Sequence, residues 1–326
     1  MYRYYRCGMR LLGASLLACL CLAARAADFP SQPIQFVSPY SAGGTNDFLT
    51  RLMARHMGDA LPGTIVVENR AGANGIVGAS YVAKAAPDGY TVLMGNSATH
   101  GTNPTLYPDA PYDPVKDFAP ISMVGSVPIV LAINAGLGVN NVAELISYAR
   151  KHPGKLSFGS SGVGGTGHLA GESFNAAAKL DMTHVPYKGD APAVTDAMGG
   201  QVSMAFVGVA SAAPHVASGK LKIIAVANPR RVGSLPDVPT FAEAGFKDLV
   251  FAQWYALFAR AGTPDATIQK LNQAARQVIE RKDVRESMAS QGAEPTYTTP
   301  EELAAFSRSE VERFGRIIKD LHIAVK

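Results

Sequence analysis

The chain has 326 residues, of which 47% are hydrophobic and 17% charged, and these values describe a globular protein rather than a disordered chain or a set of membrane spans. Its length is sufficient for two domains with ordinary cores. The formal charge is +4, but four of the 30 basic residues are arginines before position 27. The remaining chain therefore has 26 basic and 26 acidic side chains, so charge does not favour nucleic acid as a partner.

The first 26 residues are typical of a cleavable export signal. Arginines precede an apolar run over 11–24, and Ala24-Arg25-Ala26 has the form of a signal peptidase site. The run is shorter than the roughly 20 residues that a membrane-spanning helix needs. We expect residues 1–26 to be a signal peptide and the protein to be periplasmic, with lipidation at Cys19 as the alternative. All three cysteines lie in this segment, so we expect no disulfide and no cysteine-ligated metal afterwards.

After the leader, short apolar segments alternate with amphipathic ones, as in an α/β fold. Strands are predicted at 34–37, 64–67 and 91–94, with helices from about 45 and over 76–85. This β-α-β-α-β unit should have parallel strands and right-handed crossovers.

A second α/β unit follows. Its predicted strands are 127–133, 155–158, 182–185, 202–207 and 221–227, and its predicted helices are 141–151, 168–179 and 192–200. The segments 103–117 and 228–248 show no period and are predicted to be surface loops. A strand over 253–259 and two helices, beginning near 263 and 299, end the chain.

The two last helices have no strands of their own, so we expect them to pack on the first sheet. The chain would then cross between the units twice, near Ser126 and near Phe251, and two such crossings make a hinge. This predicts a first lobe of residues 27–126 with 252–326, and a second lobe of residues 127–251.

Two glycine-rich turns each lead from a strand into a helix. The first lies in the stretch from Phe36 to Asp47, and the second in the stretch from Phe158 to Gly171. Such a turn leaves backbone N–H groups unpaired at the positive end of a helix dipole, which suits it to bind an anion. The segment 95–100 follows the third strand and should lie at the same sheet edge as the first turn. We interpret the turns as facing each other across a cleft and holding one small anionic metabolite.

The second turn also bears on three other kinds of site: a dinucleotide site, a nucleophile elbow and a metal site. Gly162-x-Gly164-x-x-Gly167 satisfies the dinucleotide pattern, but the match is weak in a chain with 32 glycines. A nucleophile elbow fails because Gly159-Ser160-Ser161-Gly162-Val163 lacks the final glycine. His168 and Glu172 share a helix face as metal ligands could, with a packing or capping histidine as the alternative. We therefore expect no cofactor and no metal.

Five stretches are similar to the Bug family (TctC-like) of solute-binding proteins of tripartite tricarboxylate transporters. They are Pro39-Tyr40-x-x-Gly43-Gly44-x-x-Asp47, Val67-Glu68-Asn69-Arg70-x-Gly72-x-x-Gly75, Gly159-Ser160-Ser161-Gly162 through Gly167-His168-Leu169, Val185-Pro186-Tyr187-Lys188-Gly189 with Ala191-Pro192-Ala193, and Asp237-Val238-Pro239-Thr240-Phe241 with Glu243 and Gly245. The resemblance covers essentially the whole chain. It implies an α/β, two-lobed periplasmic binding protein (type II, Venus-flytrap), in which each lobe is a doubly wound sheet and two hinge crossings join the lobes.

The resemblance also implies a small carboxylate or amide ligand, held by backbone amides and ordered water. Carried over by motif, the first-lobe contacts are Tyr40, Ala42, Gly43, Gly44, Thr45 and Asp47, and the second-lobe contacts are Ser160, Ser161, Gly162, Gly165, Thr166 and His168. Asn96, Thr99, Tyr187 and Asp190 complete the candidate site. Asp47 has an alternative role as a helix cap, and Asp190 is a candidate partner for a ligand amine.

The function expected from the sequence is extracytoplasmic capture of a small carboxylate or amide for delivery to membrane permease subunits, by a monomer that is not an enzyme. Two rivals stay open. One is a periplasmic hydrolase or transferase that uses Ser161 or His168, and the other is a ligand-sensing subunit of a membrane signalling system. The identity of the ligand stays open as well.

Overall fold

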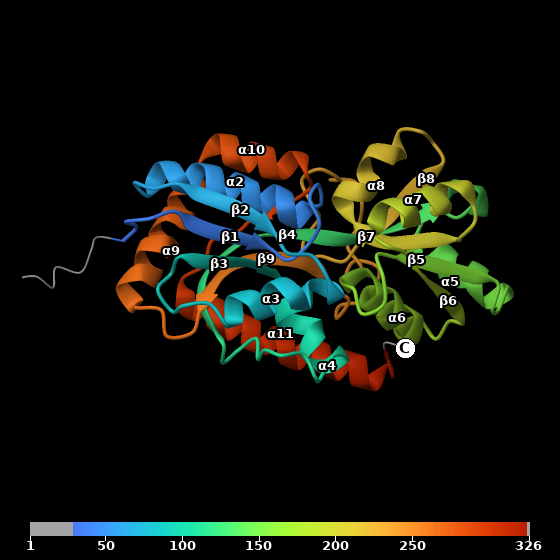
Figure 1. The fold of residues 1–326 in the computed structure, drawn as a ribbon. Helices are drawn as coiled ribbons and strands as arrows, with labels where there is room; N and C mark the ends of the chain where they lie inside the picture. Colours follow the sequence, from blue (N-terminus) through green and yellow to red (C-terminus); the bar gives the residue numbers. More distant parts are fainter. Residues whose placement is uncertain (1–28, 325–326) are drawn as a thin grey trace, which may run out of the picture.

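The computed structural model describes residues 29–324, so the expected signal peptide and Cys19 lie outside the described residues. The chain forms two α/β lobes whose strands join in one ten-stranded mixed sheet (Figure 1). The strand order is β2-β1-β3-β9-β4-β7-β5-β6, and β8 and β10 also pair with β4. The two-lobed α/β architecture predicted from the sequence is confirmed.

The first lobe contains the parallel unit that the sequence predicts. Its elements are β1 (Ile34–Ser38), α2 (Thr45–Ala60), β2 (Ile65–Asn69), the short turn η1 (Ala73–Gly75), α3 (Ile76–Ala83), β3 (Thr91–Asn96), η2 (Ala98–Thr102) and α4 (Asn103–Leu106). β1 pairs in parallel with both β2 and β3. The predicted surface loop over 103–117 is wrong at its start, because α4 occupies that stretch and Asn103 is fully buried.

The second lobe follows a long central strand. Its elements are β4 (Phe118–Asn134), η3 (Ala135–Leu137), α5 (Val142–Lys151), β5 (Leu156–Ser160), α6 (Thr166–Ala178), β6 (Met182–Pro186), α7 (Asp190–Gly199), β7 (Met204–Gly208), α8 (Val209–Val216) and β8 (Leu221–Val226). α8 was not predicted: it is only eight residues long and contains Pro214, which breaks a helical pattern. β4 starts nine residues before the predicted strand.

The chain returns through β9 (Ala252–Arg260) and ends in α9 (Asp265–Glu280), α10 (Lys282–Ser290), β10 (Glu294–Pro295) and α11 (Pro300–Asp320). Three helices therefore follow β9, where the sequence predicted two. The break falls at Arg281, whose extended backbone separates α9 from α10. α11 begins with the capping box of Thr299 and Glu302 that the sequence indicates.

Two strands carry the chain between the lobes. β4 pairs with β9 up to Pro128, opposite Ala252, and from Ile129 it pairs with β7. A single strand thus contributes to the part of the sheet in each lobe, and β9 begins at the point where β4 changes its partner. The largest cluster of buried hydrophobic residues continues past this point, from α2 and α9 in the first lobe to α7 and β8 in the second. Two further clusters lie mainly in the second lobe and in the first lobe, respectively.

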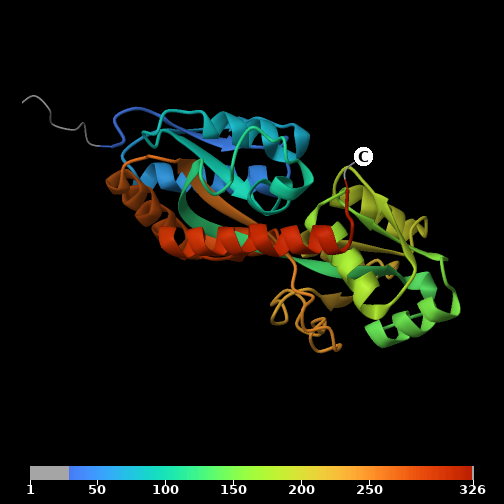
Figure 2. The ribbon, with the colours of Figure 1, turned by 90° about the horizontal axis from the view of Figure 1, so that it is seen from below.

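α11 lies along both lobes, as Figure 2 shows from below. Phe314 and Ile318 belong to the core cluster of the second lobe, whereas Leu303, near the start of the helix, packs in a first-lobe cluster. Among residues 29–324, no helix is both long enough and apolar enough to cross a membrane.

A buried charge fixes α11 to the second crossing. Glu310 is 6% exposed and accepts hydrogen bonds from Trp254 Nε1 (2.9 Å) and Arg313 Nε (2.7 Å). Arg313 also donates to the Val250 carbonyl (3.1 Å), just before β9. A paired buried carboxylate of this kind tolerates burial because each partner supplies a donor.

We expect Glu310→Ala to lower the free energy of unfolding by about 3 kcal/mol, because it leaves Arg313 and the Trp254 indole without their acceptor. Glu312→Ala removes the same charge from an exposed position of the same helix and should change it by less than about 0.5 kcal/mol. Urea unfolding of the two variants measures the difference. Equal losses would show that the buried pair does not stabilise the crossing.

Candidate functional site

The first glycine turn presents the start of α2 without a side-chain cap. Gly44 is the N-cap residue and makes no side-chain hydrogen bond, and Gly43 has φ +91°, a left-handed conformation that favours glycine. Residues 41–44 are exposed. In Figure 1, β1 leads toward the second lobe, so the turn that follows it lies on the side where the lobes meet. The first-turn amides of α2 are thus available to an anion.

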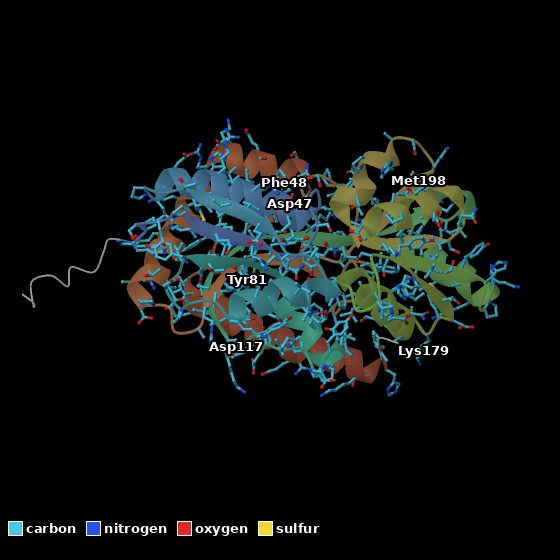
Figure 3. All side chains as sticks on the ribbon, in the orientation of Figure 1. Asp47, Phe48, Tyr81, Asp117, Lys179 and Met198 are labelled. Carbon is cyan, nitrogen blue, oxygen red and sulfur yellow. The ribbon has the colours of Figure 1, made fainter. Side chains whose placement is uncertain are left out.

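Asp47 holds this turn from behind. Its carboxylate accepts from Gly43 N–H (3.0 Å), from Asn69 Nδ2 (2.8 Å) and from Arg51 Nε (3.1 Å). Burial of the Asp47 carboxyl opposes ionisation, but these hydrogen bonds outweigh it and lower its pKa. The carboxylate is 4% exposed, and Figure 3 labels it at the start of α2. Of the two roles considered for Asp47, its contacts fit the structural one.

Tyr40, Asn96 and Thr99 form a polar cluster beside the first turn. Asn96 Nδ2 donates to the Tyr40 hydroxyl (3.0 Å), and Asn96 Oδ1 accepts from Thr99 N–H (3.0 Å). Burial raises the pKa of Tyr40, so its hydroxyl stays neutral. Thr99 is fully buried, and its hydroxyl accepts from Asn96 N–H (2.9 Å). Asn96 and Thr99 therefore build the loop after β3 and hold Tyr40 in place.

The second turn opens α6 in the same way. Gly165 is the N-cap residue without a side-chain hydrogen bond, and Gly162 and Gly164 have φ +140° and +74°. Ser160 is fully buried, and its hydroxyl lies 2.8 Å from His184 Nε2 and donates to the Gly162 carbonyl (3.2 Å). These contacts fix the turn and leave the first amides of α6 uncapped.

Two stacked histidines lie under the second turn. His168 Nδ1 accepts from Gly164 N–H (3.0 Å), and the His168 and His184 rings stack with centroids 3.8 Å apart. Burial lowers the pKa of His168 to about 3, with a further contribution from His184, and burial lowers that of His184 to about 4. His168 Nε2 is 3.8 Å from Glu172. Both rings are neutral near pH 7, and His168 packs and caps the turn.

The second turn packs against the first lobe. The hydroxyls of Ser97, after β3, and Thr166, at the start of α6, are 3.1 Å apart. Gly164 is buried against Leu106 of α4, and a Cβ at position 164 would overlap Leu106 Cδ1. The start of α6 in the second lobe therefore touches the loops of the first lobe.

A bridging network of five side chains, defined here as Thr45, Tyr255, Gln253, Asp190 and Ser161, connects the turns along β9. Thr45 at the first turn interacts with Tyr255, whose hydroxyl donates to Gln253 Oε1 (3.1 Å). Gln253 and Ser161 of the second turn both approach the Asp190 carboxyl, which accepts from Gly208 N–H (3.0 Å). Elements from both lobes thus line one polar region.

Tyr187 points elsewhere. Its hydroxyl donates to Asp196 Oδ2 (2.7 Å) on α7, and its ring packs over Gly159. Burial, with Asp196 beside it, raises the pKa of Tyr187 to about 12. Tyr187 therefore supports β5 and α7.

A cavity of about 1280 Å³ lies between α11, α6 and residues 245–252. It is separate from the candidate site, because its lining includes neither turn.

Sequence reasoning missed several residues of this region. The sequence did not indicate as site residues Ser97, Leu106, His184, Gln253 and Tyr255. Gln253 had a usable signal, since it is a polar residue beside the predicted crossing. Within residues 29–324, no three His, Cys, Asp or Glu side chains are grouped as metal ligands.

The chain matches the model of the TctC family, the tripartite tricarboxylate transporter family receptors, over residues 49–323. It belongs to this family. Protein BugT of Bordetella pertussis is 35% identical over 91% of this chain and 92% of its own length. An R. palustris protein solved with adipate superposes with a TM-score of 0.82 at 35% identity, covering 91% of this chain and 99% of that one. MatC from Rhodopseudomonas palustris with bound malate has a TM-score of 0.77 at 32% identity, covering 89% and 100%.

Membership of the family confirms the resemblance inferred from the five sequence stretches. The family consists of solute-binding receptors, and the two-lobed fold is shared with solved members, including periplasmic binding protein BugD at a TM-score of 0.79. No comparison assigns the contact residues of this chain.

We expect Gly164→Ala to cost about 1–3 kcal/mol more than Gly138→Ala. Both positions have φ near +73° and carry similar backbone strain, but a Cβ at Gly138 meets nothing within 4 Å, whereas one at Gly164 overlaps Leu106. Adding Leu106→Ala to Gly164→Ala should recover the excess. Urea unfolding measures all three. Equal losses at both glycines would contradict the contact between the lobes.

We expect stability to fall as the pH drops below about 6.5. His168 and His184 have lowered pKa values in the folded chain, so the unfolded chain binds more protons between pH 6.5 and about 4. Each histidine then contributes a loss of up to about 1.4 kcal/mol per pH unit. The raised pKa values of Glu172 and Asp190 act in the opposite direction.

His168→Gln should flatten this dependence, measured as the free energy of urea unfolding from pH 7 to pH 4.5. His100, whose pKa burial lowers to about 3, remains in the variant as a further contributor. An unchanged slope would mean that His168 is not held neutral by the fold.

Proposed function

We propose that this chain is a periplasmic solute-binding protein that holds a small carboxylate or amide between its lobes and delivers it to the permease of a tripartite tricarboxylate transporter. The observation that carries the proposal is the pair of uncapped helix starts, α2 and α6, which come from different lobes and which the bridging network connects from Thr45 to Ser161. The relatives solved with adipate and with malate support a carboxylate as the ligand class.

The number of available donors is sufficient for useful affinity. A hydrogen bond to a charged group contributes about 1.5–3 kcal/mol. Four such bonds, less the cost of association and ordering, are compatible with a dissociation constant on the order of micromolar. The ligand would favour the closed arrangement because it bonds to both lobes at once.

Residues 1–26 act as the export signal, residues 27–126 with 252–326 form the first lobe, residues 127–251 form the second, and the protein acts as a monomer. The ligand contacts are the backbone amides of the two turns. The side chains of Tyr40, Thr45, Ser161 and Thr166 lie beside these amides and complete the contacts.

An enzymatic role has less support. Ser160 lies 2.8 Å from His184, as in a Ser–His pair, but Ser160 is fully buried and its hydroxyl is engaged with the backbone of Gly162. A nucleophile must be reachable by its substrate. Ser161 lies beside Asp190 instead of a histidine. We therefore assign the serines to shaping and lining the turn.

The direct test is a thermal-shift panel of succinate, malate, adipate, citrate and their monoamides, with recovery of the ligand after incubation. We expect at least one member to raise the melting temperature in a concentration-dependent way and to be recovered unchanged. Turnover of the ligand would favour the enzyme, and no shift with any member would oppose the proposal.

Replacing Thr166 by proline removes one backbone N–H donor from the second turn. Thr166 is the first residue of α6, where proline is tolerated, and Gly165 has ψ 157°, which suits a residue before proline. Thr166→Pro and Thr166→Ala both lose the hydroxyl, but only the proline loses the N–H. Calorimetric titration should show binding at least about tenfold weaker for Thr166→Pro than for Thr166→Ala. Equal affinities would show that this amide does not hold the ligand.

A further inference from the structure

Asp190 is the acidic member of the bridging network, and its carboxyl is incompletely paired. Oδ2 accepts from Gly208 N–H at 3.0 Å, whereas Oδ1 is buried and has no hydrogen-bond partner among residues 29–324. Ser161 and Gln253 approach the carboxyl without completing a hydrogen bond to Oδ1. A buried acceptor without a donor is unfavourable, so it indicates a group that is satisfied in another state of the molecule.

The groups around Asp190 carry no positive charge. Those that act on it are the Gly208 amide, the Ser161 hydroxyl and the Gln253 carboxamide, and no basic side chain is among them. Two helix starts lie close by, since Asp190 is the first residue of α7 and Gly208 is the N-cap of α8. These starts stabilise the carboxylate but leave Oδ1 without a donor.

Gln253 cannot easily turn to another partner. Its Oε1 accepts from the Tyr255 hydroxyl at 3.1 Å, which directs the amide group away from Tyr255 and toward Asp190. Tyr255 is buried and interacts in turn with Thr45. The Asp190 carboxyl is thereby held between the second turn and the hinge strand β9.

The region contains two kinds of hydrogen-bonding group. The starts of α2 and α6 present N–H donors, whereas Asp190, between them, presents the acceptor Oδ1. We infer that Asp190 selects a ligand with two unlike ends: a carboxylate, held by the turn amides, and an N–H or O–H donor, which bonds to Asp190 Oδ1. The ligand class is therefore a carboxylate that also carries an ammonium, amide or hydroxyl group. This inference rests on the proposed function, since it concerns the same bound solute.

The inference is tested by one isosteric exchange in the ligand and one in the protein. A dicarboxylate and its monoamide have the same shape, but one terminal oxygen of the dicarboxylate becomes an NH2 donor in the monoamide. Asp190→Asn makes the matching change in the protein and keeps an oxygen that can accept from Gly208 N–H. Asp181→Asn is the control, because Asp181 is an exposed acid at the edge of the same lobe.

The wild type and both variants are titrated calorimetrically with succinate and succinamate, glutarate and glutaramate, and adipate and adipamate. We expect the wild type and Asp181→Asn to bind the donor-bearing member of at least one pair about tenfold more tightly than the dicarboxylate. Asp190→Asn should reduce that ratio at least tenfold or reverse it.

Three outcomes would overturn the inference. If Asp190→Asn keeps the ratio of the wild type, Asp190 does not supply the preference, although the proposed function stands. If the wild type binds dicarboxylates as tightly as their donor-bearing partners, Asp190 does not select a donor, although the proposed function stands. If no carboxylate of either kind binds, the proposed function fails and the inference fails with it. Circular dichroism and the melting temperature confirm that Asp190→Asn folds. Asp190→Ser, which also loses the carboxyl but keeps a helix-start residue, replaces it if it does not.

Discussion

The site depends on backbone amides left uncapped at the starts of α2 and α6. Helices in water usually satisfy these groups with a side chain at the N-cap, but glycine occupies the position at both starts. The free donors are a permanent feature of the fold, because they come from the backbone. The surrounding side chains then serve to keep the turns in shape: Asp47 accepts from Gly43, and His168 accepts from Gly164.

The hinge determines whether the two sets of donors can reach one ligand. β4 is a single strand that runs through both lobes, and β9 begins beside the point where β4 changes its partner. α11 spans the junction, with Glu310 and Arg313 holding the second crossing. A small rotation at these strands would separate Ser97 from Thr166 while leaving each turn intact. Binding can therefore be coupled to closure through rigid movement of the lobes alone.

The turns themselves were predictable from the sequence, whereas their surroundings were not. Glycines clustered between an apolar strand and an amphipathic helix mark Gly43–Gly44 and Gly162–Gly165 through local preferences only. The contact of Gly164 with Leu106 and the stack of His168 on His184 join residues far apart in the chain, which no local pattern reports. α8 was missed because a proline and a short length weaken its periodicity. The role of Tyr255 was not predictable either, because the sequence of an apolar strand does not indicate which of its side chains contacts the other lobe.

Backbone amides would bind the carboxylate of a ligand but would not discriminate between ligands that differ elsewhere. Every carboxylate offers the same oxygens to the same donors, so discrimination must come from side chains that meet the other end. In the described region this leaves a short set, in which Asp190, Gln253 and Tyr255 are polar and lie between the turns. Exchanging one or two of these side chains would change the preferred solute without altering the turns, because the amides need no particular side chain to bind. Under the proposal, the acid at position 190 adds a side-chain acceptor to a set of backbone donors, and its charge gives the site a direction that the amides alone would lack.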